Sequence, residues 1–470
     1  MPTSRHSFSH RYHAVLLMVI VVTCCNVPVA GENGEFGVQP VAMVSEPDIK
    51  VMVKEIDPAH IKTTIEHLVA FGTRNTLSSQ DDHSRGIGAA RDWLFEQFQD
   101  INKTTGGRLR VEKQAFLQPV GPRVPTPTPL TNIVAMLPGD LPADRQRYVI
   151  VSGHYDSMCS SPVDAVHDAP GANDDASGTA AVLEICRVMA RHRYHATIVF
   201  LCVAGEEQGL LGSTYFAEQA KKDLWSISSM FTNDIIGGTL GGNGLHDDRS
   251  VRVFSEGIPS DETEAEARTR RSVGGEEDSR SRQIARYIKD TARRFVPAMK
   301  VMLIARRDRY LRGGDHIPFN ERGYAAVRFT EPNEDYHHQH QNVRMENGVQ
   351  YGDLPEFVDF RYVAQVARVN AAAMASLALA PDVPAGAGLV TSRLTTDTDL
   401  AWRANIEPDI AGYEIVWRDT TAPDWTHSMG VGNVTRFTVK GLSKDNYLFG
   451  IRAVDKQGLR SPIAFPRPVR

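Results

Sequence analysis

Hydrophobic and polar positions follow two different patterns along this chain, one before and one after about residue 385. In the first part, short apolar runs without polar alternation are separated by longer stretches of helical periodicity. Apolar runs of this kind are typical of strands in a parallel sheet that is covered on both faces. We predict such strands at residues 132–136, 147–151, 197–203, 230–232 and 325–329.

Between and around these strands, apolar residues recur at the spacing of one helix face. Ile61, Ile65 and Leu68 show this spacing in the first such stretch. Strands that alternate with helices indicate an α/β domain over residues 45–380, with a mostly parallel central sheet flanked by helices on both faces. We predict its helices at residues 58–71, 86–98, 179–189, 209–222, 284–295 and 358–379.

Residues 246–283 interrupt this pattern, since they contain ten acidic residues, seven arginines and few apolar side chains. A segment of that composition buries too little apolar surface to join a folded core. We therefore predict that residues 246–283 form a charged, solvated loop or lid, inserted into the α/β domain.

The second pattern covers residues 386–470, after a linker that contains Pro and Gly. Apolar and polar residues alternate with a period of two in short segments, and Gly, Pro and Asp separate these segments. This pattern predicts a small all-β sandwich of the immunoglobulin type. It resembles a fibronectin type III module, because Trp417 lies on the second predicted strand and Gly441-Leu442 precedes Tyr447.

The N-terminal residues combine basic, apolar and small side chains in that order. Arg5 and Arg11 lie before or at the edge of an apolar run at 14–22, and Pro28-Val29-Ala30 follows it. This order resembles a secretory signal peptide over residues 1–30, and the apolar run is short for a transmembrane helix. We expect an exported protein, periplasmic or secreted, which touches a membrane only if the segment stays uncleaved as an anchor.

Charge and cysteine content exclude other classes of function. The formal net charge is −5, and no basic stripe is interleaved with aromatic residues, which argues against nucleic acid as a partner. Removal of the signal segment would leave Cys159, Cys186 and Cys202, an odd number that makes no disulfide framework. None of them belongs to a Cys-x-x-Cys pair, so a metal site must rest on histidine and carboxylate ligands.

Acidic and histidine side chains follow the predicted strands at their carboxyl ends, where reactive groups collect in an open parallel sheet. Asp174 and Asp175 are adjacent carboxylates between small residues, directly before a predicted helix. One of them can cap that helix, but the pair is better explained if the other binds a cation. The remaining candidates are His154, Asp156, Glu206, Glu207, Asp234 and His340.

Each candidate also has an ordinary structural explanation. His154 alone could be a loop histidine. The Glu206-Glu207 pair could be favoured at the start of the next helix by the helix dipole. Histidines and carboxylates at several strand ends are, however, the expected ligand set of a two-metal site. In such a site one acid of the pair can bind a metal while the other takes a proton from water. Asp156 can accept the second ring N–H of His154.

The order and spacing of these motifs resemble the zinc-dependent exopeptidases typified by secreted bacterial leucine aminopeptidases, a family related to the glutaminyl cyclases. The resemblance covers roughly residues 55–380, and it rests on His154-x-Asp156-Ser157, Gly171–Gly178, Glu206-Glu207 and Asn233-Asp234. It implies a hydrolase that removes residues from peptides with a free N-terminus and that binds two zinc ions.

The resemblance also implies which residues hold the two zinc ions. Asp174 would bridge them. His154 and Asp234 would complete one metal site, and Glu207 and His340 would complete the other. Because His340 is followed by Gln-Asn-Val where the family has Thr-x-x-Asp, His337 is an alternative for the last ligand.

Four further residues receive roles from the same resemblance. Glu206 would be the general base, and Asp156 and Asp175 would support the ligands. Gly314-Asp315-His316 resembles a family segment near the pocket, which makes Asp315 a possible contact of the site. Alternative functions on this scaffold are a glutaminyl cyclase-like acyltransferase, which is associated with one working zinc, a carboxypeptidase, and a silent binding protein. No partner of the C-terminal module is indicated.

Overall fold

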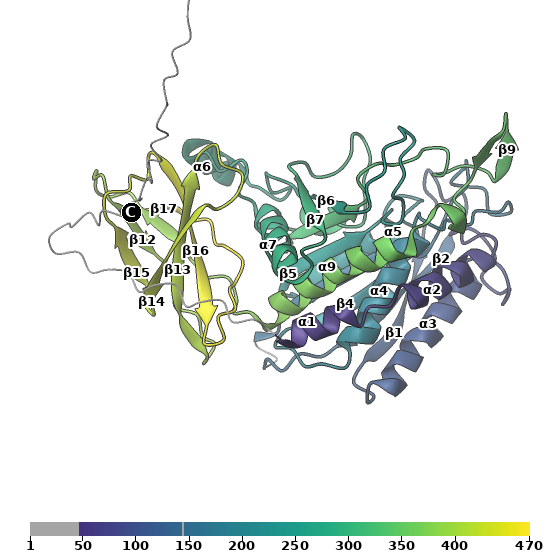
Figure 1. Cartoon of the computed structure of the whole chain (residues 1–470), viewed down its shortest axis with the longest axis horizontal. Helices are drawn as coiled ribbons and strands as arrows, with labels where there is room; N and C mark the ends of the chain where they lie inside the picture. Colours follow the sequence, from purple (N-terminus) through teal and green to yellow (C-terminus); the bar gives the residue numbers. More distant parts are fainter. Residues whose placement is uncertain (1–46, 143–144) are drawn as a thin grey trace, which may run out of the picture. The chain divides into compact units, whose positions relative to one another are not determined.

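The computed structural model describes residues 47–142 and 145–470, whose helices and strands are drawn in colour in Figure 1. The predicted signal segment at residues 1–30 lies outside the described residues. Within those two ranges, no helix is long and apolar enough to cross a membrane.

A central sheet has eight strands in the order β1-β2-β4-β3-β5-β8-β6-β7. Strands pair in parallel from β4 through β3 and β5 to β8, and again between β6 and β7. The other pairings are antiparallel. The strands are β1 Arg110–Gln118, β2 Thr128–Leu137, β3 Tyr148–His154, β4 Thr197–Val203, β5 Ile227–Asn233, β6 Ser250–Phe254, β7 Lys300–Ile304 and β8 Ala326–Thr330.

Helices cover both faces of this sheet, as the sequence predicted. Val149 and Val151 of β3 pack in one core cluster with α2, α4 and α9, whereas Ile150 packs in a second cluster with α5 and α8. The helices are α1 Pro47–Lys54, α2 Pro58–Ala70, α3 Ile87–Thr104, α4 Ala176–Met189, α5 Leu211–Lys222, α6 Glu264–Val273, α7 Arg280–Phe295, α8 Ile317–Glu321 and α9 Phe360–Leu379. The predicted α/β class with a mostly parallel sheet is therefore confirmed.

The interpretation of residues 246–283 as a solvated loop is wrong for the first part of that segment. Ser250–Phe254 form β6, a buried strand that lies between β8 and β7. The apolar side chains of Val251, Val253 and Phe254 are enough for this short strand, but charged residues on both sides hide them in the overall composition. In contrast, α6 has no buried residue, and Ser279 caps α7 earlier than predicted.

Residues 388–469 form two small sheets that share one core, as the predicted sandwich requires. One sheet has the order β15-β12-β11-β17 and the other β14-β13-β16, and all neighbours are antiparallel except β11 and β17. Leu400, Tyr413 and Phe449 are buried between them. The strands are β11 Gly388–Val390, β12 Thr398–Ala401, β13 Ile410–Asp419, β14 His427–Gly432, β15 Arg436–Val439, β16 Tyr447–Asp455 and β17 Arg467–Val469.

Buried polar contacts join these small sheets to α7. Asp278 accepts hydrogen bonds from Arg286 of α7 (2.8 Å) and from Arg418 of β13 (2.7 Å). The three side chains are at most 5% exposed. Trp425 Nε1 also donates to Gln283 Oε1 of α7 (2.9 Å). The connection therefore involves more than the linker that the sequence predicted.

Candidate metal centre

The candidate residues lie at the carboxyl ends of the central strands, as expected for this kind of sheet. His154 is the last residue of β3, and Asp234 directly follows β5. Glu206 and Glu207 lie in the loop after β4, and His340 lies in the long loop after β8. Segments from four different strands therefore meet at one edge of the sheet.

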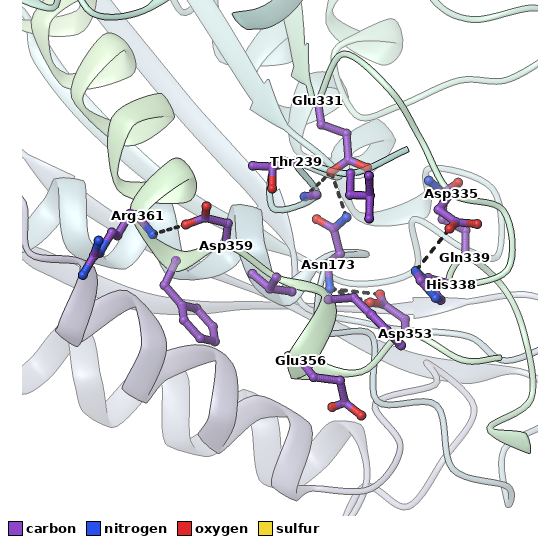
Figure 2. A pocket seen from close by; sticks show the side chains of 15 residues that line it. Asn173, Thr239, Glu331, Asp335, His338, Gln339, Asp353, Glu356, Asp359 and Arg361 are labelled. Carbon is purple, nitrogen blue, oxygen red and sulfur yellow. Dashed lines mark hydrogen bonds and ion pairs between the residues drawn. The ribbon is translucent and has the colours of Figure 1, made fainter. Parts of the chain in front are cut away.

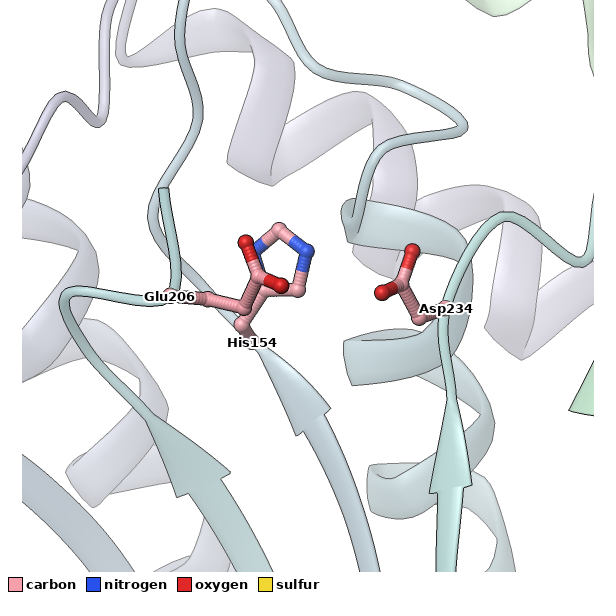
Figure 3. Close-up of side chains that lie close together, drawn as sticks. All are labelled: His154, Glu206 and Asp234. Atoms are coloured by element: carbon pink, nitrogen blue, oxygen red, sulfur yellow. The ribbon is translucent and has the colours of Figure 1, made fainter. Parts of the chain in front are cut away.

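A first cluster contains His154, Glu206 and Asp234, each from a different strand end (Figure 3). One possible ligand atom from each residue lies within 4.8 Å of the other two. His154 and Asp234 are buried, and Glu206 is half-buried. Imidazole and carboxylate atoms at this separation can share one metal ion.

A second cluster contains Asp174, Glu207 and His340, whose candidate ligand atoms also lie within 4.8 Å of one another. His340 Nε2 is 2.9 Å from Asp174 Oδ2 and 3.2 Å from Glu207 Oε2. Asp174 and Glu207 are buried, but the His340 side chain is 32% exposed. The site is therefore open to solvent on the His340 side.

Asp174 lies between the two clusters. Its Oδ1 is 3.1 Å from His154 Nε2, and its Oδ2 is 2.9 Å from His340 Nε2. The peptide amide of Asp174 donates to Asp353 Oδ2 (2.7 Å), and this contact fixes the backbone. Each oxygen of one carboxylate thus faces the histidine of a different cluster.

Of the three neighbouring histidines, His340 is the one that lies against Asp174. The His337 ring is instead 2.8 Å from Asp335 Oδ1, and its side chain is 48% exposed. The His338 ring stacks on Phe357 with 3.6 Å between ring centroids. His337, the alternative to His340 as the last metal ligand, therefore lies outside both clusters, beside Asp335.

Asp175 and Asp156 fix the backbone around the clusters. Asp175 caps α4 through Gly178 N (2.9 Å) and also accepts from His154 N (3.0 Å). Asp156 accepts from the amides of Glu206 (3.3 Å) and Glu207 (3.2 Å). The main-chain carbonyl of Asp156 is 3.2 Å from His154 Nδ1, and its carboxylate is 3.5 Å away. The carboxylate of Asp156 therefore positions the acidic pair more directly than the imidazole ring.

The clusters hold four carboxylates and two histidines. Burial raises the pKa of Glu206 and of Glu207, and other carboxylates nearby add to that effect. Burial also acts to raise the pKa of Asp174, but the contacts with His154 and His340 outweigh it and hold the pKa well below its usual range. Burial lowers the pKa of His340, yet Glu207 and Asp174 raise it to about 11. A bound cation would relieve this excess of negative charge.

Two buried atoms indicate that the clusters suit a metal. His154 Nε2 and Glu207 Oε1 are shielded from solvent and have no hydrogen-bonding partner among the described residues. Buried polar atoms normally have a partner, since leaving one unsatisfied costs about 1 to 3 kcal/mol. Both atoms are of the kind that zinc binds. His154 Nε2 lies 3.1 Å from Asp174 Oδ1, and the other oxygen of Glu207, Oε2, lies 3.2 Å from His340 Nε2.

A cavity of about 540 Å³ borders the loop that carries Asp174, and Figure 2 shows its acidic lining. Most of these acids support the backbone: Asp353 accepts from the amide of Asn173 (2.8 Å), and Glu331 accepts from the side-chain amide of Asn173 (2.8 Å). Asp359 caps α9. Asp353 and Glu331 were not predicted from the sequence, although Glu331 lies two residues after the end of the predicted strand at 325–329.

Arg328 is another residue that the sequence analysis did not single out. It lies in β8, its side chain is fully buried, and its Nη2 is 2.8 Å from Asp234 Oδ1. Its Nη1 is 3.4 Å from Asp308 Oδ2. The sequence does carry a signal for Arg328, because it is a charged residue inside an otherwise apolar strand and a buried guanidinium needs a carboxylate partner.

Asp315, which the sequence indicated as a contact of the site, is fully buried, and burial raises its pKa to about 7.

Comparisons with known proteins agree with this chemistry. The family model described as peptidase family M28 matches residues 132–353. A probable zinc metalloprotease of Pyricularia oryzae is 46% identical over 454 residues, which are 95% of this chain and 90% of that protein. A probable zinc metalloprotease of Leptosphaeria maculans is 44% identical over 432 residues, which are 92% of this chain and 100% of that protein.

A solved structure shares the fold. The LapA aminopeptidase of Legionella pneumophila matches with a TM-score of 0.51 and 17% identity, over 73% of this chain and 78% of that chain. At this identity the likeness concerns the arrangement of helices and strands.

Proposed function

The chain belongs to the zinc metalloproteases of peptidase family M28, and from this premise we propose that it is an aminopeptidase with two zinc ions. It hydrolyses the peptide bond next to a free N-terminus. The observation that carries the proposal is the position of Asp174, whose two oxygens face different histidines. A carboxylate in that position would offer one oxygen ligand to each of two metal ions.

In this proposal the two clusters provide the remaining ligands. His154 and Asp234 would hold one zinc ion, and Glu207 and His340 would hold the other. Asp156 and Asp175 keep the ligand backbones in place through the hydrogen bonds to Glu206, Glu207 and His154. When bound, the two zinc ions supply an activated water and polarise the scissile carbonyl.

Glu206 is the general base. Its carboxylate lies in the first cluster but is half-buried, so it is accessible to a water molecule that attacks the substrate. It takes a proton from that water and returns it to the leaving amine, a role that contributes about 10²- to 10⁴-fold to the rate.

Charge supports the preference for a free N-terminus. The site holds four carboxylates, and the resulting negative potential favours the α-ammonium group of a substrate. The fold is shared with LapA, which is named an aminopeptidase.

A substrate panel tests this function. Purified protein is treated with a chelator, assayed on leucine anilide and on N-acetyl-leucine anilide, and assayed again after zinc is added back. We expect hydrolysis of the free amine, no hydrolysis of the acetylated compound, loss of activity on chelation and recovery with zinc. Equal rates on both compounds would contradict the aminopeptidase assignment. Cyclisation of N-terminal glutamine without hydrolysis of either anilide would favour the acyltransferase.

We also propose that the protein is exported and that residues 1–30 are removed. The support is the order of basic, apolar and small residues at the N-terminus. Expression of the full chain in a secreting host, followed by N-terminal sequencing of the protein in the medium, tests this. A retained protein with an intact N-terminus would contradict it.

A further inference from the structure

Two arginines lie near the clusters of carboxylates and histidines: Arg328 is fully buried against Asp234, whereas Arg312 is partly exposed. Its Nη1 donates to Glu334 Oε2 (3.0 Å) and to Gln339 Oε1 (3.4 Å). Gln339 directly precedes His340, whose side chain is the exposed one of the second cluster. The Arg312 side chain is itself 30% exposed. Arg312 therefore lies on the side from which a substrate reaches the clusters.

The backbone next to Arg312 passes close to the first cluster. A Cβ atom placed on Gly314 would lie 3.4 Å from Asp234 Oδ2. Burial lowers the pKa of Arg312, but Glu334, Asp174 and Asp234 outweigh that effect and raise it. The guanidinium is thus within electrostatic reach of an acid from each cluster.

Arg312 shares its carboxylate partner with other arginines, because Glu334 also contacts Arg252 and Arg309. Three carboxylates, those of Glu334, Asp308 and Asp234, contact four arginines. Three of these arginines, Arg252, Arg309 and Arg328, have side chains that are at most 18% exposed. Arg312 is the most exposed of the four, so its guanidinium is the one that a ligand can reach.

One edge of the Arg312 guanidinium is free. Among the described residues, its Nε and Nη2 atoms have no hydrogen-bonding partner, because both of its bonds come from Nη1. The Nε and Nη2 atoms form the edge that binds both oxygens of a carboxylate, as Arg270 does with Glu262 in this protein. The free edge is therefore the one suited to a planar acidic group.

We propose that Arg312 binds a carboxylate of the substrate, on the residue that follows the scissile bond. This inference rests on the proposed function and names its substrate class. In a dipeptide, the terminal carboxylate carbon is only two bonds, about 2.5 Å, from the scissile nitrogen. An Asp or Glu side chain on the same residue is the second source of such a group. Dipeptides and peptides with an acidic second residue are thus the preferred substrates.

Four substrates distinguish these sources: Leu-Gly, Leu-Gly amide, Leu-Asp amide and Leu-Asn amide. In the wild type we expect kcat/KM to differ by about 10- to 100-fold within one of two substrate pairs, chiefly through KM. Either kcat/KM is higher for Leu-Gly than for Leu-Gly amide, or it is higher for Leu-Asp amide than for Leu-Asn amide. Arg312→Gln should abolish that difference and leave the uncharged substrates within about twofold. A difference between Leu-Gly and its amide identifies the terminal carboxylate as the group that Arg312 binds. A difference between Leu-Asp amide and Leu-Asn amide identifies the side-chain carboxylate.

Arg309→Gln is the matched control, because Arg309 contacts the same Glu334 but is only 9% exposed. It should keep the preference of the wild type. Equal wild-type rates within both substrate pairs would overturn the proposal. So would an Arg312→Gln variant that slows all four substrates by the same factor, since that result indicates a merely structural role.

A binding measurement separates this inference from the proposed function. The Leu-Gly analogue with a reduced scissile bond, and its amide, are titrated into the zinc-loaded protein by calorimetry. We expect the wild type to bind the free acid more tightly by about 10- to 100-fold and Arg312→Gln to bind both equally. Such binding without hydrolysis of any substrate would reject the aminopeptidase and keep the role of Arg312. Equal affinities in the wild type would reject that role.

Discussion

At the scale of single residues, the chemistry depends on which atoms face each other across the site. Asp174 lies 3.1 Å from His154 Nε2 and 2.9 Å from His340 Nε2, with a different oxygen in each contact. Glu206 and Glu207 are adjacent in sequence, yet they belong to different clusters. Their amides share one acceptor, Asp156, which holds the pair in that divergent arrangement.

Glu206→Gln should separate metal binding from catalysis. The amide keeps the shape of the side chain but cannot take a proton, so we expect two bound zinc ions and a kcat lower by about 10²- to 10⁴-fold. Zinc content and kcat are measured on the same preparation. Near-normal turnover with two zinc ions bound would remove Glu206 from the mechanism.

His340→Ala should weaken one of the two zinc ions and spare the other. Asp174 and Glu207 would still offer oxygen ligands, so the affinity falls without vanishing, and excess zinc restores part of the rate. His337→Ala and His338→Ala are the controls, since these rings contact Asp335 and Phe357. Loss of a zinc ion from His337→Ala, with both retained in His340→Ala, would reverse the assignment of this ligand.

At the scale of elements, much of the α/β part could be predicted because its strands and helices carry their own apolar pattern. β4 and α9 are examples, since nearly every buried position is apolar. β1 could not be predicted, because most of its residues are charged or polar and only half-buried at best. β6 was hidden by its charged neighbours. Local pattern identifies an element only when the element itself supplies the apolar surface.

The site residues at strand ends could be predicted for a different reason. The parallel arrangement brings the carboxyl ends of the strands together. The positions of His154, Glu206 and Asp234 at the ends of predicted strands were therefore enough to predict that they lie close together. Asp353 had no such signal, because its role depends on the amide of Asp174, 179 residues earlier. Arg312 likewise depends on Glu334 and Gln339 in another loop. Contacts between distant loops are not encoded in a local pattern.

Phe254→Ala tests whether residues 246–283 contribute to the core. Phe254 is 3% exposed in β6, so its truncation should lower the free energy of unfolding by about 3 to 5 kcal/mol. Val273→Ala in α6, which has no buried residue, should change it by about 0.5 kcal/mol or less. Urea unfolding of both variants gives the comparison. Equal, small effects would restore the interpretation as a solvated loop.

At the scale of the whole molecule, the C-terminal sheets contribute to the stability of the α/β part. Because a linker with Pro and Gly precedes residues 386–470, the sequence alone predicts that a chain ending near Pro384 stays soluble and active. Such a truncation, however, removes Arg418 from the buried carboxylate of Asp278 and Trp425 from Gln283. The metal centre lies entirely before residue 353, so we expect the truncated chain to keep its ligands and lose stability.

Asp278→Ala measures the strength of this connection in the full chain. It leaves Arg286 and Arg418 buried without their carboxylate, which should cost about 3 to 5 kcal/mol of stability. Asp424→Ala, which breaks the more exposed pair with Lys289, should cost about 1 kcal/mol or less. Thermal unfolding followed by fluorescence gives both values. An Asp278→Ala variant as stable as Asp424→Ala would show that the two parts are independent.

The number of zinc ions bound per chain is the most direct test of the proposed two-zinc site. Metal-free protein is titrated with zinc, and the bound ions are counted by native mass spectrometry. The bridging position of Asp174 predicts two zinc ions in the wild type and weaker binding of both in Asp174→Ala, in contrast to the single weakened ion of His340→Ala. A wild type that saturates with one zinc ion, or an Asp174→Ala variant that still binds two with unchanged affinity, would contradict the account.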